Sequence, residues 1–172
     1  MKSFFNNPEY EWRETFFIMF NEKKCSRLTS ERISGMLKDS PYSSLEVKIF
    51  GAAAEGGFRR ILFSSPLNKA VVEVYFHQGE SVLRQSREFY DGLYAILDMS
   101  ERLKWQEILN FTACYELVYF EYFVKPLKIA EEFSEDDSNY DPGMLLFLLE
   151  KLTHHSHGVA LDPQSGMILD VD

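Results

Sequence analysis

Three histidines gather at the end of the last helix that the sequence predicts. His154 and His157 are three residues apart with His155 between them, and Asp162 follows across the next turn. Imidazole and carboxylate groups at such spacing can hold a transition metal, although no His-Glu-x-x-His motif is present and the spacing is generic. Imidazolium groups at a helix C-terminus also stabilise the exposed carbonyls without a metal, and they can respond to pH. The sequence favours the structural role and leaves His154, His157 and Asp162 as candidate metal ligands.

The other motifs for nucleophilic or phosphate chemistry are incomplete. The glycine-rich and alanine-rich run at 51–57 precedes a predicted strand, whereas a phosphate loop leads into a helix and ends in Lys-Ser or Lys-Thr. Cys25 lies near basic residues that could lower its thiol pKa, but no histidine of the same motif supports it as a nucleophile, which favours a surface cysteine. The Gly-x-Ser-x-Gly elbow of hydrolases is absent from the sequence. We therefore expect no catalytic residue in these motifs and no cofactor.

The acidity of the chain is concentrated in its last quarter. The formal net charge is −9, yet only 1 of the 18 Lys and Arg and 10 of the 27 Asp and Glu lie after residue 130, which leaves 17 of each before it. The centre of this acidic stretch consists of Glu131, Glu132, Glu135, Asp136 and Asp137. Such a charge block usually keeps a loop solvated, and it can also meet a basic partner. Nucleic acids and anionic lipids require clustered Lys and Arg, so we expect neither as a partner.

Length and composition indicate a single globular domain over residues 1–172. Hydrophobic residues make up 45% of the chain and aromatic residues 15%, which suffices for a core and argues against disorder. Cys25 and Cys114 are too few for a disulfide framework, and no leader with a small-residue cleavage site opens the chain. The longest apolar run in a helical context, 144–149, is far shorter than the roughly 20 residues of a membrane span. We expect a cytoplasmic protein that does not cross a membrane.

The candidate groups must be positioned by a sheet whose centre is a meander of three strands. Short apolar runs at 45–50, 60–64 and 70–76 are rich in β-branched and aromatic residues and are separated by turn-forming residues. Before the meander we expect an extended arm at 1–11, a strand at 12–20 and a short helix capped by Thr29 or Ser30. After it, an apolar stripe from Gly79 to about residue 97 predicts a second helix.

The second half of the chain adds two helices, an aromatic strand and a hairpin. A short helix is expected from Ser100 to about Asn110, and the run at 114–123 favours a strand over a helix because of its aromatic residues. An acidic loop at 131–140 then leads to an apolar helix with Asp141 as N-cap, Pro142 at its first position and Gly158 as the left-handed residue after its end. Runs at 159–161 and 167–169 predict a hairpin.

This order of elements predicts an α+β fold with a mainly antiparallel sheet and helices packed on it. A strand, a helix, a three-strand meander and a helix make a ferredoxin-like arrangement of the first half a plausible alternative, from which the extra strand departs. The second half ends in a helix and a hairpin.

Two terminal stretches resemble a known group of proteins. Trp12-Arg13-Glu14-Thr15-Phe16-Phe17-Ile18-Met19-Phe20 and Gly158-Val159-Ala160-Leu161-Asp162-Pro163-Gln164-Ser165-Gly166 are similar to the two ends of a small family of bacterial proteins with no assigned activity. The resemblance implies a bacterial, cytosolic α+β protein and transfers no catalytic residue.

Two functions from different classes follow from the sequence. The first is a non-enzymatic, protein-binding module of an accessory or immunity type, whose acidic residues Glu131, Glu132, Glu135, Asp136 and Asp137 meet a basic protein. The alternative is a metal-dependent or small-ligand enzyme that uses His154, His157 and Asp162. The sequence leans towards the first and names no substrate.

Overall fold

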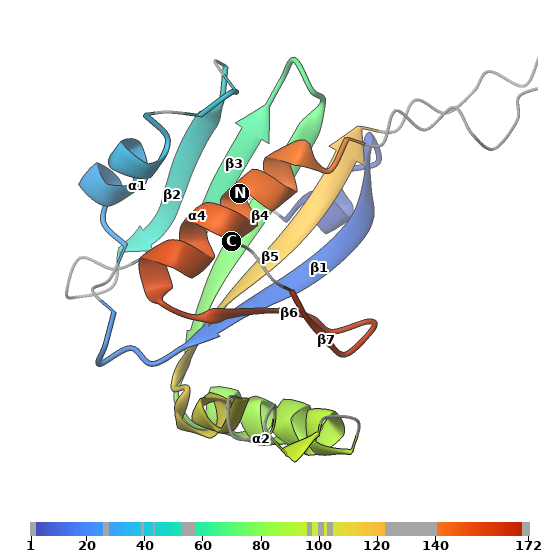
Figure 1. The fold of residues 1–172 in the computed structure, drawn as a ribbon. Coiled ribbons are helices and arrows are strands. Elements are labelled where there is room, and N and C mark those ends of the chain that lie inside the picture. Colours follow the sequence, from blue (N-terminus) through green and yellow to red (C-terminus); the bar gives the residue numbers. More distant parts are fainter. Residues whose placement is uncertain are drawn as a thin grey trace, which may run out of the picture.

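Seven antiparallel strands form one sheet in the order β2-β3-β4-β5-β1-β6-β7 (Figure 1). The computed structural model describes residues 3–25, 28–38, 40–42, 44–52, 58–95, 98, 99, 102, 105–122 and 141–169. The strands are β1 (Tyr10–Phe20), β2 (Glu46–Ala52), β3 (Phe58–Ser65), β4 (Ala70–Gln78), β5 (Ala113–Tyr122), β6 (Val159–Asp162) and β7 (Met167–Leu169). The helices are α1 (Ser30–Met36), α2 (Glu80–Tyr94) and α4 (Gly143–Ser156), with 3-10 turns η1 (Phe4–Asn6) and η2 (Gln106–Asn110).

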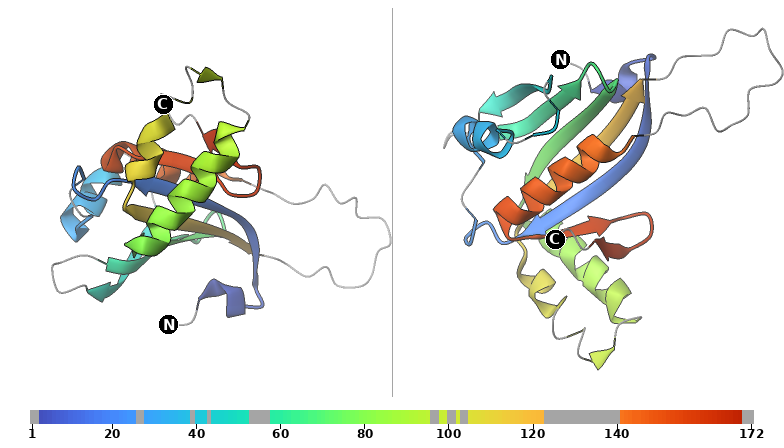
Figure 2. Two further views of the ribbon diagram at one scale, coloured as in Figure 1. Left: turned by 90° about the horizontal axis from the view of Figure 1, so that it is seen from below. Right: turned by 45° about the horizontal axis from the view of Figure 1, so that its top comes forward.

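The two faces of the sheet are covered by different elements. Helix α4 runs across one face of the sheet (Figures 1 and 2). Helix α2 packs on the other face, at one end of the sheet. Because successive strand residues point to opposite faces, Ile18 of β1 packs in the cluster that holds the apolar side chains of α4, and Met19 packs with Val82 and Leu93 of α2. A third cluster, which includes Val71 and Phe120, packs against η1 at the other end of the sheet. The core is therefore split into layers on both sides of the sheet.

The α+β fold with helices packed on a mainly antiparallel sheet is confirmed, while the ferredoxin-like alternative does not describe the strand order. A split βαβ unit places one strand between the two that flank its helix. Here three strands, β5, β4 and β3, separate β1 from β2, the strands on either side of α1. Strand β5 pairs with both β4 and β1 along most of its length, so it occupies the centre of the sheet.

Most predicted elements are present, with shifts at their ends. Thr29 caps α1 by accepting a hydrogen bond from the Arg32 N–H at 3.4 Å, as the sequence predicts. The predicted arm is shorter than residues 1–11, because β1 already begins at Tyr10 and pairs there with Tyr122. Its aromatic residues do dock, since the Phe4 ring packs edge-on against Tyr10 at 4.8 Å between centroids. Of the helix predicted from Ser100 to about Asn110, the described residues Arg102 and Trp105 are α-helical, and its last part is the 3-10 turn η2.

The end of α4 differs from the prediction in one residue. His157, not Gly158, adopts the left-handed conformation, with φ 48° and ψ 39°. Gly158 is required for a different reason, because a Cβ at this position would lie 2.6 Å from the Met19 carbonyl oxygen of β1. Glycine therefore allows the chain leaving α4 to approach β1 closely. The predicted acidic loop, 131–140, lies outside the described residues.

Candidate functional site

The histidine cluster lies at a helix end that is closed by backbone hydrogen bonds. The His157 N–H donates to the His154 carbonyl at 3.4 Å, and the Gly158 N–H donates to the Thr153 carbonyl at 3.2 Å. This pair of bonds is the Schellman motif, in which the residue after the helix is usually glycine. Here that residue is His157, and its ring lies 6.5 Å from the ring of His154 between centroids. The motif therefore positions two of the three predicted side chains.

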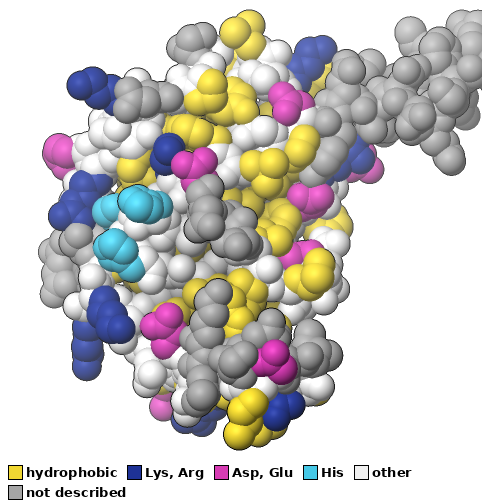
Figure 3. Space-filling view, viewed as in Figure 1, with side chains coloured by type: hydrophobic (Ala, Val, Ile, Leu, Met, Phe, Trp, Pro, Cys, Tyr) yellow, Lys and Arg dark blue, Asp and Glu magenta, His cyan; other side chains and the backbone are white. Residues whose placement is uncertain are grey.

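The imidazoles line an open hollow together with an arginine from α1. The hollow has a volume of about 380 Å³ and is lined by Arg32, His154, His155 and His157. Histidine side chains gather beside Lys and Arg side chains on this part of the surface (Figure 3). The sequence does not single out Arg32, because it precedes the cluster by more than 120 residues. The hollow combines four side chains that can donate hydrogen bonds or carry positive charge.

Asp162, the third predicted metal ligand, is engaged elsewhere. Its carboxylate accepts hydrogen bonds from the Gln164 N–H at 2.8 Å and from the Ser165 hydroxyl at 2.6 Å, both in the turn between β6 and β7. Burial raises the pKa of this carboxyl, but the hydrogen bonds from Ser165 and Gln164 outweigh it, and the net pKa is lowered. Within the described ranges, no three His, Cys, Asp or Glu side chains come close enough to hold a metal ion. The structure brings together His154 and His157 and does not add Asp162 to them.

Cys25 lies next to the hollow and has no property of an activated thiol. Its Sγ donates to the His155 carbonyl at 3.5 Å, and its side chain packs against the core below α4. Burial raises the pKa of the thiol, and the nearby Arg32 lowers it by less. The basic residues near Cys25 in the sequence could lower the pKa of its thiol, but in the structure burial dominates over the neighbouring positive charge. The sequence favours a surface cysteine that is no nucleophile, and the side chain is partly exposed.

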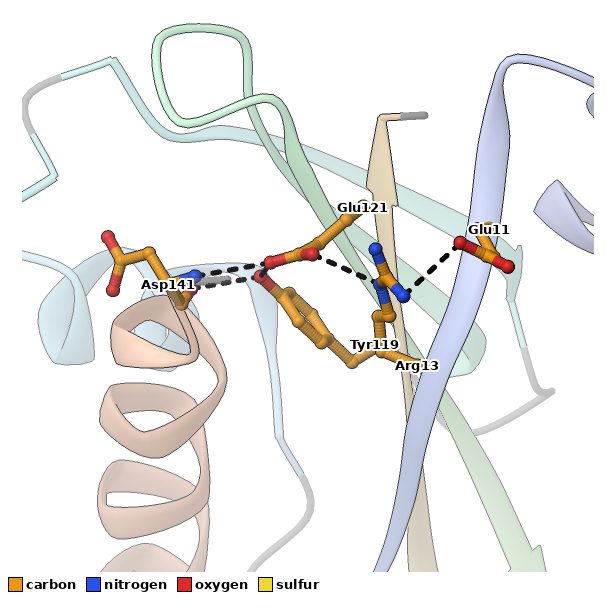
Figure 4. Close-up of polar contacts among 5 residues, drawn as sticks. All are labelled: Glu11, Arg13, Tyr119, Glu121 and Asp141. Carbon is orange, nitrogen blue, oxygen red and sulfur yellow. Dashed lines mark hydrogen bonds and ion pairs between the residues drawn. The ribbon is translucent and has the colours of Figure 1, made fainter. Parts of the chain in front are cut away.

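Two buried glutamates that the sequence analysis does not single out organise the polar interior. Glu121, on β5, is 8% exposed and accepts a hydrogen bond from the Arg13 Nε at 3.1 Å (Figure 4). Its other oxygen accepts from the Asp141 N–H at 3.2 Å and lies 2.8 Å from the Tyr119 hydroxyl. That hydroxyl is also 2.9 Å from the Asp141 carbonyl, so its single proton serves one of two acceptors. We call these four residues the Glu121 clamp.

A β-bulge brings the arginine into the Glu121 clamp. Trp12 pairs with Phe120 and Glu14 pairs with Tyr119, so Arg13 is an extra residue on β1. Bulges redirect a side chain that would otherwise follow the alternation of the strand. Glu11 shares the guanidinium through an ion pair of 3.2 Å (Figure 4). The clamp fastens Asp141, two residues before α4, to the C-terminal end of β5.

The second buried glutamate fastens the N-terminal turn to the opposite face of the sheet. Glu73, on β4, is 1% exposed and accepts hydrogen bonds from the Ser3 hydroxyl at 2.8 Å and the Phe4 N–H at 3.3 Å. The Tyr75 hydroxyl also donates to it, and the Arg60 guanidinium lies 3.6 Å away. A glutamate within the apolar run at 70–76 is the only sequence signal of this network, because a charge in a buried strand needs partners.

The remaining predicted site residues and the comparisons add no further groups. Glu131, Glu132, Glu135, Asp136 and Asp137 lie outside the described residues. No helix of the described chain is long and apolar enough to cross a membrane. Comparisons with protein-family models, with curated proteins and with solved structures found no match to this chain. The resemblance of the two terminal stretches to a small bacterial family stays a prediction.

Proposed function

We propose that this chain is a non-enzymatic, protein-binding module that uses its acidic segment, residues 131–141, to bind a basic protein. The observation that carries the proposal is the segregation of charge: this segment of 11 residues holds Glu131, Glu132, Glu135, Asp136, Asp137 and Asp141 and no Lys or Arg. The rest of the chain before it is balanced in charge. A concentrated field of one sign speeds encounter with a partner of the opposite sign and suppresses wrong partners.

The Glu121 clamp supports this role because it fixes the base of the segment. The backbone of Asp141 is held by Glu121 and Tyr119, and the Asp141 carboxylate accepts from the Gly143 N–H at 2.9 Å at the start of α4. The described residues on either side of residues 123–140, Tyr122 and Asp141, therefore both belong to or are bonded to regular elements. A binding segment whose ends are fixed loses less conformational entropy when its partner binds than one on a free tail.

An accessory or immunity-type role in the bacterial cytoplasm is the form of this proposal that fits the chain best. Cys25 and Cys114 are free thiols in the structure, as is usual in a reducing compartment. The buried carboxylates Glu73 and Glu121 are held by structural partners, so they serve the fold. The charged groups left for recognition are those outside the core.

Neutralising the acidic segment tests the proposal. The variant carries Glu131→Gln, Glu132→Gln, Glu135→Gln, Asp136→Asn and Asp137→Asn, and it is compared with the wild type in co-purification from the native cell at low and high salt. We expect one basic protein to be retained at about 50 mM salt, to be lost at about 500 mM because exposed charges are screened, and to be absent from the variant.

A matched control removes the same number of negative charges elsewhere. Exposed carboxylates on other parts of the surface are neutralised in one variant: Glu9, Glu22, Glu88, Asp91 and Glu107. The control has the same net charge as the test variant, so it should retain the partner if position matters more than total charge. Equal retention by the test variant and the control, or no partner at any salt concentration, contradicts the proposal.

The second candidate is a metal-dependent or small-ligand enzyme at the histidine cluster, and the hollow beside His154 is the observation that favours its small-ligand form. Elemental analysis of protein made without a histidine tag tests the metal-dependent form. A transition metal at about one equivalent that is lost on His154→Gln would support it. Metal-free protein would exclude the metal-dependent form, and only the small-ligand form would remain.

A further inference from the structure

We propose that the hollow at the C-terminal end of α4 binds a phosphate group, either as free phosphate or as part of a phosphomonoester. Of the residues that the structure describes, Arg32, His154, His155 and His157 line the hollow; all four are nitrogen donors or cations, and none of these four is a carboxylate. The inference deepens the small-ligand candidate and rests on no step of the protein-binding proposal.

The chemistry of the lining selects an anion over a metal ion. A guanidinium presents N–H groups in a fixed fork that matches phosphate oxygens, and imidazoles donate through their ring N–H groups. A metal ion needs unprotonated nitrogen or oxygen ligands and would be repelled by Arg32. Asp162, the carboxylate that would complete a metal site with His154 and His157, is bound in its own turn.

The backbone of His157 places its imidazole beside that of His154. With φ 48°, His157 is the left-handed residue of the Schellman motif, a conformation that glycine prefers and that histidine adopts more often than most other residues. Gly158 is needed where it is, because of the approach to the Met19 carbonyl. The rings of His154 and His157 lie 6.5 Å apart between centroids, and both line the hollow.

The helix dipole opposes an anion at this place, and the structure reduces that opposition. The C-terminal end of a helix carries a partial negative charge on its free carbonyls. Here the Thr153 carbonyl accepts from the Gly158 N–H and from the Ser156 hydroxyl, and the His154 carbonyl accepts from the His157 N–H. Arg32, which comes from α1 and not from α4, adds positive charge that does not depend on this helix.

The hollow is open to solvent and has room for a ligand larger than phosphate alone. About 380 Å³ of open space leaves room for the group that carries the phosphate. A phosphomonoester should therefore bind more tightly than inorganic phosphate, by about threefold or more, if its body also contacts the hollow.

Titration of the full chain with inorganic phosphate, followed by NMR of the histidine ring protons and carbons, tests the inference. Ionic strength is kept constant with chloride at pH 6.5, and phosphoserine is titrated in a second series. We expect saturable shifts of the His154 and His157 rings with a Kd of about 1–10 mM, as for an open surface site. In His157→Gly and in Arg32→Gln the Kd should rise at least about fivefold.

Control variants separate the site from general effects of charge and folding. His77→Gln removes an exposed histidine of β4 and should leave the Kd unchanged. His157→Gly favours the left-handed backbone, so this variant should fold at least as stably as the wild type, and urea unfolding checks that it does. The inference is overturned if the ring shifts do not saturate up to about 100 mM phosphate, or if all variants bind phosphate with equal affinity. It is also overturned if Zn²⁺ shifts the histidine rings saturably and phosphate does not shift them.

Discussion

Glu121→Gln should destabilise the protein by about 2 kcal/mol. The amide keeps the shape of the carboxylate but has one acceptor where the carboxylate has two. If its oxygen takes the Asp141 N–H and the Tyr119 hydroxyl, its NH₂ group faces the Arg13 Nε; if it is turned round, it faces the Asp141 N–H. Either orientation leaves a part-buried donor without an acceptor, and for a buried donor that loss costs about 1–3 kcal/mol. The remaining ion pair of Arg13 with Glu11 moderates the loss.

Urea unfolding followed by circular dichroism measures this change, and thermal unfolding should show a Tm lower by about 4–8 °C for a chain of this length. Glu116→Gln is the matched control, because Glu116 lies on the same strand and pairs with His77 at 2.7 Å, but with 30% and 47% of the two side chains exposed. Exposed pairs contribute at most about 1 kcal/mol. Equal losses in the two variants, or a loss below about 0.5 kcal/mol in Glu121→Gln, would refute the clamp as a stabilising unit.

Three further predictions follow from the backbone and the core. Gly158→Ala should lower the free energy of unfolding by about 2 kcal/mol or more, because the added Cβ meets a backbone carbonyl of β1; Gly92→Ala, with open space around it in α2, should raise it by about 0.5–1 kcal/mol in the same urea assay. His157→Gly should stabilise by about 0.5–1 kcal/mol by relieving a positive φ, and a destabilised variant would contradict the strain. Burial raises the pKa of the Cys114 thiol and of the Tyr115 phenol, so the unfolded state releases their protons first. The free energy of unfolding should therefore be independent of these two groups below about pH 8.5 and should decrease as the pH rises further. In Cys114→Ala this decrease with pH should be weaker. An unchanged decrease in the variant would contradict the prediction.

The local elements could be predicted from the sequence because their signals are short in range. The alternation in the apolar run at 70–76 and the turn residues around it predict β4 and its hairpin. Thr29 as the cap of α1 follows from the preference of hydroxyl side chains for free N–H groups. The aromatic run before Pro126 predicts β5, whose aromatic side chains fill both faces of the sheet.

The strand order and the polar networks could not be predicted, because they depend on contacts distant in sequence. β5 lies between β4 and β1, and its partner residues on β1 are about 100 positions away. Arg13 reaches Glu121 only because a bulge redirects its side chain, and no residue type in the strand predicts that bulge. Similarly, Arg32 joins the histidines because α1 lies beside the end of α4, which no local pattern encodes.

The two buried glutamates solve the same structural problem on opposite faces of the sheet. η1 and the start of α4 are segments without strand pairing, and each must be held in place by side chains. Glu73 binds the Ser3 hydroxyl and the Phe4 N–H on one face, and Glu121 binds the Asp141 N–H on the other. A buried carboxylate with several donors adds little to stability over an apolar core, but it specifies which segment docks and in which orientation. Both carboxylates are therefore committed to the fold, which leaves the acidic segment and the basic hollow at the other end of α4 as the two sites that we propose for recognition.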